Sequence, residues 1–251
     1  MKIAVVAITR HGIALAEKVL AALPGAQLFA PEKFRSEAEE AAPGAAHCYA
    51  GKTGEQIPAL FANFDGIVAI VSLGAMVRLM APHLKDKEQD PGVVVLDEAG
   101  RYAIPVLAGH LGGANALAGK LADALGALPV LTTASDARGT LAVDLLGREL
   151  GWTFAATKQA IVRASAAVVN EEPVALVQEA GSRDWWARHA NGRSNPLPAN
   201  IQLLEKIEEL DPARYGAVLW ITHRQSDALP AALHEAMRDR LMVYTPPQEQ
   251  V

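Results

Sequence analysis

Residues 66–75 read GIVAIVSLGA, a run of apolar and small residues that ends at Ser72, Leu73 and Gly74. The apolar part, from Ile67 to Val71, does not alternate with polar residues. Such a run is typical of a strand that is covered on both faces in a parallel sheet. The stretch therefore predicts a central strand of an open α/β sheet, followed by a helix from Ala75 to His83.

On both sides of this stretch, short apolar runs alternate with helical patterns, as expected for a parallel sheet flanked by helices. Further strands are predicted at 2–8, 26–29, 93–96, 102–107 and 129–131, and further helices at 13–23, 54–64 and 114–125. Residues 36–46 predict a short exposed helix followed by a loop. The fold class is α/β, with a doubly wound, mostly parallel sheet of the Rossmann or flavodoxin-like type.

The pattern of apolar and polar residues changes after Asp136, where we predict a second, smaller α/β domain. It has predicted helices at 141–150 and 157–166, predicted strands at 174–178, 217–222 and 241–244, and a loop-rich stretch that reaches residue 200. The expected domains are residues 1–138 and 139–251, with the boundary region at 138–150.

Composition excludes several classes of protein. The chain has 251 residues, a net charge of −5 and one cysteine, Cys48, so a disulfide-stapled domain is excluded and a structural zinc site is disfavoured. Neither half has an excess of basic residues, which makes duplex nucleic acid an unexpected partner. No run approaches the roughly 20 apolar residues that cross a bilayer, and the N-terminus has no signal-peptide pattern. We expect a cytoplasmic protein with no membrane partner.

In an open parallel sheet, ligands bind at the carboxyl ends of the strands, where loops and helix N-termini converge. The loops after the predicted strands are therefore expected to lie together. They are Thr9–Gly12, Ser72–Ala75, Asp97–Gly100, Gly109–Asn115 and Thr132–Asp136.

The strongest of these loops is Gly109–Asn115, which has three glycines before an amphipathic helix. Glycines let the backbone approach a ligand closely, and the amides at a helix N-terminus favour an anion. The alternative is that Gly112 and Gly113 only make a tight turn. The spacing does not follow G-x-G-x-x-G, so a nicotinamide cofactor is weakly supported.

Four acidic or basic side chains in these loops have both a catalytic and a structural interpretation. His110 is the best single acid/base candidate, because imidazole titrates near neutral pH, although a histidine in a turn is often only solvated. Asp97 and Glu98 close an apolar strand and are expected either to orient His110 or bind a cation, or to be solvated turn residues. Asp136 has the same alternatives, and a third as a helix N-cap.

Other candidate groups are weaker. Ser72 lacks the glycine that precedes a nucleophile elbow, since residue 70 is isoleucine, so we do not expect it to be a nucleophile. The seven histidines show no helical pairing, and no metal site is predicted. Arg78, Lys85 and Lys87 either meet an anionic ligand or belong to a solvated charge run.

At these same loops the sequence resembles the N-terminal domain of the CbiG family of cobalamin biosynthesis proteins, known as cobalt-precorrin-5A hydrolase. The resemblance runs through several ordered motifs over residues 50–136, and residues 140–230 are similar to the family's middle domain. The motifs that carry it are Ser72–Lys87, Asp90-Pro91, Val93–Glu98, Gly109–Asn115 and Thr132–Asp136.

The resemblance implies a step of oxygen-independent vitamin B12 synthesis. Water opens the ring A δ-lactone of cobalt-precorrin-5A, and C20 leaves with its methyl group as acetaldehyde, giving cobalt-precorrin-5B. It implies His110 as general base or acid, oriented by Asp97 or Glu98, with the Gly112 and Gly113 amides stabilising negative charge. The cobalt comes with the substrate, so no cofactor of the protein is expected. The implied substrate-binding residues are Arg10, Ser72, Gly74, Arg78, Gly109, Gly112, Gly113, Asn115, Thr132, Thr133 and Asp136.

The sequence departs from the family at one point. Many members continue into a C-terminal domain with a Cys-Arg-Arg-Gly motif, and no cysteine follows Cys48 here. An alternative function is therefore a non-catalytic tetrapyrrole-binding subunit that works with a separate C-terminal-domain protein. A more distant alternative is a nucleotide- or sugar-phosphate-binding protein. The expected partners are the tetrapyrrole substrate, a second copy of the chain in a homodimer, that C-terminal-domain protein or neighbouring pathway enzymes.

Overall fold

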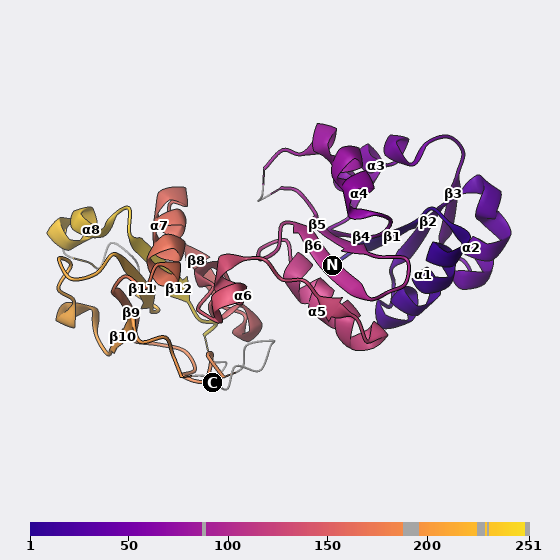
Figure 1. The fold of residues 1–251 in the computed structure, drawn as a ribbon. Coiled ribbons are helices and arrows are strands. Elements are labelled where there is room, and N and C mark those ends of the chain that lie inside the picture. Colours follow the sequence, from indigo (N-terminus) through magenta and orange to yellow (C-terminus); the bar gives the residue numbers. More distant parts are fainter. Residues whose placement is uncertain (87–88, 188–195, 225–228, 230, 249–251) are drawn as a thin grey trace. The chain divides into compact units, whose positions relative to one another are not determined.

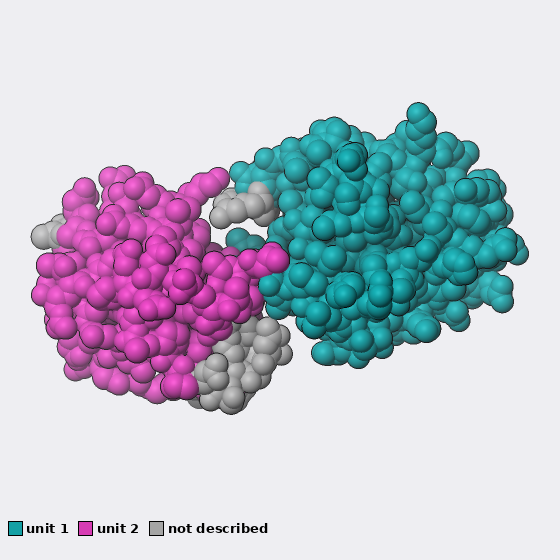
Figure 2. Space-filling model, viewed as in Figure 1, with its two compact units in different colours: residues 1–131 teal, residues 132–251 magenta. Residues whose placement is uncertain are grey.

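The computed structural model describes residues 1–86, 89–187, 196–224, 229 and 231–248 (Figure 1). The chain divides into two compact units, Met1–Leu131 and Thr132–Val251 (Figure 2). The division lies a few residues before the predicted boundary at 138, because the first sheet ends with β7 and the chain leaves unit 1 directly after it. None of the helices in the described ranges has the length and apolar composition of a membrane-spanning segment.

Unit 1 is built on a seven-stranded sheet with the order β3-β2-β1-β4-β5-β6-β7. The first five strands of this order are mutually parallel, whereas β6 runs antiparallel to β5, and β7 is parallel to β6. The strands are β1 (Ile3–Ala7), β2 (Gln27–Pro31), β3 (Ala46–Tyr49), β4 (Gly66–Ile70), β5 (Gly92–Leu96), β6 (Tyr102–Leu107) and β7 (Leu128–Pro129).

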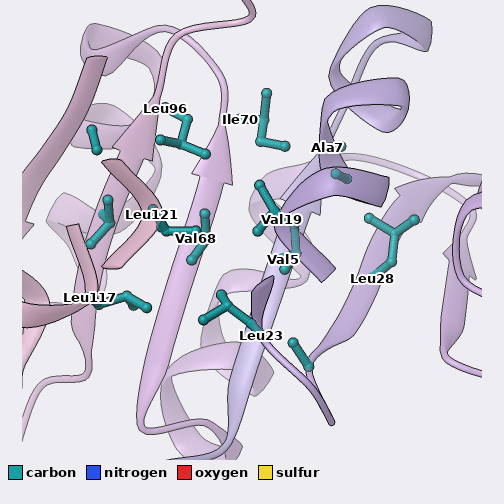
Figure 3. Close-up of a cluster of buried hydrophobic side chains, with 14 of the residues drawn as sticks. Val5, Ala7, Val19, Leu23, Leu28, Val68, Ile70, Leu96, Leu117 and Leu121 are labelled. Atoms are coloured by element: carbon teal, nitrogen blue, oxygen red, sulfur yellow. The ribbon is translucent and has the colours of Figure 1, made fainter. Parts of the chain in front are cut away.

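Helices cover both faces of this sheet, which confirms the doubly wound fold class. Alternate residues of β4 enter different cores: Val68 and Ile70 pack with α1, α2 and α5, while Ile67 and Ala69 pack with α3 and α4. Figure 3 shows the first of these cores, with Val68 and Ile70 beside Val19 and Leu121. The helices are α1 (Arg10–Ala22), α2 (Arg35–Ala41), α3 (Ile57–Asn63), α4 (Leu73–Met80) and α5 (Ala114–Leu125).

The direction of β6 corrects one expectation about the strand-end loops. Val93 of β5 pairs with Leu107 at the end of β6, and Leu96 pairs with Ala103 near its start. The loop after β6, Gly109–Asn115, therefore lies at the edge where the parallel strands begin. The prediction that it converges with Ser72–Ala75 and Asp97–Gly100 at one edge is wrong.

Unit 2 contains a second, five-stranded sheet with the order β10-β9-β11-β12-β8, in which only β8 is antiparallel to its neighbour among the described strands. Helix α7 packs on one face, through Ala164 and Val168, and Met237 of α8 packs on the other. The elements are α6 (Ala134–Arg138), β8 (Thr153–Ala155), α7 (Lys158–Val169), β9 (Val174–Gln178), β10 (Ile201–Leu204), β11 (Ala217–Ile221), α8 (Ala231–Met237) and β12 (Leu241–Thr245).

The helix predicted over 141–150 is instead two 3-10 turns, Val143–Leu145 and Arg148–Leu150. Between them Gly147 has a φ of +71°, a left-handed conformation that breaks an α-helix. A Cβ atom at this position would lie 2.1 Å from the Trp152 ring, so the glycine is also required by packing. The predicted loop-rich stretch lies in part on residues 188–195, outside the described residues.

Candidate functional site

The order of the first sheet reverses between β1 and β4. Strands β2 and β3 lie on one side of β1, and β4 and β5 lie on its other side. The carboxyl ends of the strands at such a reversal frame the usual ligand-binding crevice of an open α/β sheet. A cavity of about 440 Å³ lies there, and we call it the switch-point pocket. Its polar lining residues are Thr9, Ser72, Asp97 and Glu98, and its apolar ones include Ile8 and Leu73.

Thr9 connects two of the loops that line this pocket. As the N-cap of α1, its hydroxyl oxygen accepts a hydrogen bond of 3.0 Å from the Gly12 amide, and the hydroxyl donates to the Glu98 carboxylate. A Cβ atom on Gly12 would lie 3.0 Å from the Thr9 oxygen and 3.4 Å from Ile70, so glycine allows the helix to start this close to β4. The loops after β1 and β5 are thus held together by an exposed carboxylate.

Asp97, in contrast, is used by its own turn. Its Oδ1 accepts hydrogen bonds of 2.7 Å from the amides of both Arg101 and Tyr102, and its Oδ2 lies 3.4 Å from Arg101 Nε. Burial raises the pKa of Asp97, but the hydrogen bonds from Tyr102 and Arg101 outweigh it and lower the pKa below its ordinary value. Asp97 therefore fixes the β5–β6 connection, and Glu98 is the carboxylate free of that turn network.

Helix α4 starts at the rim of the switch-point pocket. Ser72 is its exposed N-cap, and the Gly74 carbonyl accepts a hydrogen bond of 3.1 Å from Arg78 Nη1. A larger cavity of about 850 Å³ also contacts α4, through Ala75, Arg78 and Leu79, and it shares Ile8 with the switch-point pocket. Ser72, Gly74 and Arg78 thus lie near the same edge of the sheet, and their role in substrate binding stays a prediction.

The Gly109–Asn115 turn is packed tightly on itself. The Gly113 amide donates to the His110 carbonyl at 2.9 Å, and the Asn115 amide donates to the Gly109 carbonyl at 2.9 Å. A Cβ atom at Gly109 would lie 2.6 Å from Asn115 Oδ1. The Gly113 amide, expected to stabilise a negative charge, is therefore engaged within the turn.

The glycine pair of this turn is explained by close packing. A Cβ atom on Gly112 would lie 2.4 Å from the Ala108 Cβ, and one on Gly92, at the start of β5, would lie 2.5 Å from the Gly112 carbonyl oxygen. Gly113 has a φ of +78° and forms the N-cap of α5. The structure thus supports the tight-turn interpretation of these glycines.

The predicted pairing of His110 with Asp97 or Glu98 is wrong. His110 follows β6 beyond Leu107, which pairs with Val93, whereas Asp97 and Glu98 follow Leu96 at the other end of the same ladder. With a rise of about 3.3 Å per residue, the length of the strand separates the two ends. The individual catalytic roles of the three residues stay predictions.

The remaining predicted residues are not among those that line the switch-point pocket. Arg10, at the start of α1, forms an ion pair with Glu37 of α2, with 3.0 Å between Nε and Oε1. Thr132, Thr133 and Asp136 belong to unit 2, where Thr133 is the N-cap of α6 and its hydroxyl donates to Asp136. The N-cap interpretation offered for Asp136 therefore applies to Thr133. Among the described residues, no group of three or more His, Cys, Asp or Glu side chains could hold a metal ion.

Sequence reasoning missed two features of this edge. The sequence places Thr9 only within a loop, although a threonine after the first strand with glycine three residues later is an N-cap pattern. Lys33 and Lys52, which line the larger cavity, are not among the residues predicted from the sequence. The Gly51–Gly54 segment, with two glycines around Lys52 and Thr53, was the available signal.

Comparisons with known proteins match both units. The family model described as "Cobalamin synthesis G N-terminal" matches residues 55–136, and the model "Cobalamin biosynthesis central region" matches residues 141–246. A cobalt-precorrin-5A hydrolase from Priestia megaterium is 41% identical over 221 residues, which cover 88% of this chain and 57% of that protein. A second protein of the same name, from Salmonella typhimurium strain LT2, is 36% identical over 184 residues, which cover 73% of this chain and 48% of that protein.

The chain therefore spans about half the length of the curated relatives that it matches. A crystal structure of a cobalamin biosynthesis protein G homolog from Sulfolobus solfataricus aligns with a TM-score of 0.45 and 19% identity, over 98% of this chain and 60% of that one.

Proposed function

The chain belongs to the CbiG family, of which it carries the N-terminal and central regions, and on that premise we propose that it acts in the cobalt-precorrin-5A hydrolase reaction of cobalamin biosynthesis. The names of its relatives support this function. The observation on this chain that carries the proposal is the switch-point pocket, where Thr9 and Glu98 line a cavity at the carboxyl edge of the sheet.

The reaction has two bond-breaking steps. A water oxygen bonds to the lactone carbonyl carbon and the ring C–O bond breaks, which leaves a carboxylate and an alcohol at C20. Deprotonation of that alcohol then forms the C=O bond of acetaldehyde, while the C–C bond to the macrocycle breaks and the macrocycle takes the electron pair and a proton. One water is consumed and one acetaldehyde is released.

Both steps need a proton acceptor, and we assign this role to Glu98. A carboxylate can accept a proton from water or from an alcohol, and the Thr9 hydroxyl fixes the orientation of this one. Helix α4 begins at Leu73, which lines the pocket. The N-terminus of a helix stabilises negative charge, such as the charge that develops on the lactone oxygen during the reaction. Cobalt enters as part of the substrate, and the proposal requires no cofactor of the protein.

The test is an acetaldehyde assay with the purified chain and cobalt-precorrin-5A. We expect Glu98→Gln to lower the rate at least about 100-fold, the range of general-base catalysis, and Glu17→Gln, an exposed control on α1, to leave it unchanged. His110→Ala tests the base predicted from the sequence. If His110→Ala abolishes release and Glu98→Gln does not, the assignment to Glu98 is wrong.

The same assay separates the enzyme from the alternative of a tetrapyrrole-binding subunit. That alternative assigns binding of the tetrapyrrole to this chain and the chemistry to a separate protein. Tight binding of the corrinoid without any acetaldehyde, restored when a separate protein with the family's C-terminal domain is added, would establish it. Binding of nucleotides but not of corrinoids would contradict both.

A further inference from the structure

We propose that the larger cavity beside the switch-point pocket recognises the peripheral carboxylates of the tetrapyrrole through Lys33, Lys52 and Arg78. We call this cavity the cationic groove. The proposal rests on the proposed function, and it places the binding of the substrate's acidic side chains apart from the reacting lactone, which the switch-point pocket would receive.

The groove has the size and position of a ligand subsite. Its volume is about 850 Å³, within the range of small-molecule pockets. It is framed by the segments that follow β2 and β3 and by α4, and it meets the switch-point pocket at Ile8. A ligand larger than either cavity can therefore occupy both from the same edge of the sheet.

The charge of the groove favours an anion. In the part of the chain that the structure describes, Lys33, Lys52 and Arg78 form no ion pair with a carboxylate. Glu32 is the acidic residue of the lining, and Arg35 binds both of its oxygens at 2.7 and 2.8 Å. The hydrogen bond from Arg35 lowers the pKa of Glu32, which keeps this carboxylate ionised and compensated from outside the groove. Three cations thus gather on a chain with a net charge of −5.

The surface of α4 supplies the apolar counterpart. Leu73 and Val77, one helical turn apart, are 41% and 43% exposed, and Arg78 follows directly. Exposed aliphatic side chains next to cations fit a ligand with an apolar ring system and an acidic periphery. A tetrapyrrole carrying acetate and propionate side chains has this character.

The experiment measures the affinity of the full chain for a cobalt corrinoid with free peripheral carboxylates, followed by visible absorption. Lys33→Gln, Lys52→Gln and Arg78→Gln are compared with Lys18→Gln and Lys120→Gln, exposed positions on α1 and α5 with the same change of charge. We expect each groove substitution to weaken binding about tenfold and the controls to have no effect, because charged hydrogen bonds are lost only in the groove. The same corrinoid with esterified carboxylates should bind the wild type and all variants equally weakly.

The outcomes separate this proposal from the proposed function. If wild-type chain releases acetaldehyde while the groove and control variants bind the corrinoid equally, the groove proposal is overturned and the function stands. Equal losses in groove and control variants would mean a general charge effect and also overturn it. A wild-type chain that binds no corrinoid overturns both. Circular dichroism of each variant establishes that it is folded.

Discussion

At the scale of single residues, Asp97 and Glu98 are adjacent in sequence but have different partners. Asp97 accepts two backbone amides of the turn into β6, whereas Glu98 accepts the Thr9 hydroxyl at the switch-point pocket. The turn into β6 therefore engages the first carboxylate with backbone amides, whereas the second lies outside that turn network. A sequence alone shows two carboxylates and not this division.

Asp97→Ala should lower the free energy of unfolding by about 2 kcal/mol at neutral pH, because two amides lose a charged acceptor. The folded-state pKa of Asp97 is lowered, so its contribution is fully present above the ordinary aspartate pKa of about 3.9 and is lost as the pH falls below that value. The difference in free energy of unfolding between Asp97→Ala and the wild type should therefore become smaller at acidic pH. Urea unfolding at pH 7 and pH 3, followed by far-UV circular dichroism, measures it, and Asp123→Ala on the exposed face of α5 is the control. A difference that stays constant with pH would contradict this account.

Tyr244 offers a second prediction, at alkaline pH. Its hydroxyl donates to the Val143 carbonyl at 2.7 Å in the core of unit 2, and burial, followed by the charge of Asp144, raises its pKa well above the ordinary value. Its folded-state contribution is present below pH 10 and is lost as the pH rises further. Tyr244→Phe should lower the free energy of unfolding by about 1 kcal/mol at pH 8. Between pH 9 and 11, the free energy of unfolding of this variant should fall less than that of the wild type. Tyr102→Phe, which changes an exposed side chain, serves as the control. If the wild type and Tyr244→Phe lose the same unfolding free energy at alkaline pH, this explanation is wrong.

At the scale of elements, the reversal of β6 could have been predicted. Only Asp97–Arg101 separate β5 from β6, and a connection this short joins antiparallel strands, since a parallel pair needs a crossover of a dozen or more residues. A prediction that β6 is parallel to β5 places His110 at the wrong edge of the sheet. The strands that sequence reasoning missed, β3, β8 and β10, are all edge strands. An edge strand has a neighbouring strand on one side only and is less completely buried. These strands therefore lack the continuous apolar run that identifies β4 and β5.

The glycine turn before α5 gives a prediction at this scale. Gly112→Ala should lower the free energy of unfolding by about 1–3 kcal/mol, because the new Cβ atom would lie 2.4 Å from the Ala108 Cβ and 2.7 Å from its carbonyl oxygen. Gly119→Ala, within α5, meets nothing within 4 Å and should instead stabilise by about 0.5–1 kcal/mol. Thermal unfolding by circular dichroism compares them. Equal effects would mean that the turn can relax around a side chain.

At the scale of the whole molecule, each unit has its own sheet and its own pair of cores. The alternation of strands and helices predicted this organisation, because a buried parallel sheet leaves a strong apolar pattern. The local sequence pattern could not predict which of the strand-end loops lie at the same edge of the sheet. That arrangement depends on strand order and direction, which long-range pairing decides and local pattern does not encode.

All four tryptophans, Trp152, Trp185, Trp186 and Trp220, belong to unit 2, so their fluorescence reports on that unit alone. Because the two units have separate cores, we expect Gly112→Ala to shift the unfolding transition of unit 1 without moving the fluorescence transition. Far-UV circular dichroism, which sees both sheets, should then show a broader or divided transition in urea, while the tryptophan midpoint stays at the wild-type value. Tyr244→Phe should do the reverse and move the fluorescence midpoint. If both substitutions move both probes together, the two units unfold as one cooperative body, and the separate cores do not confer separate stabilities.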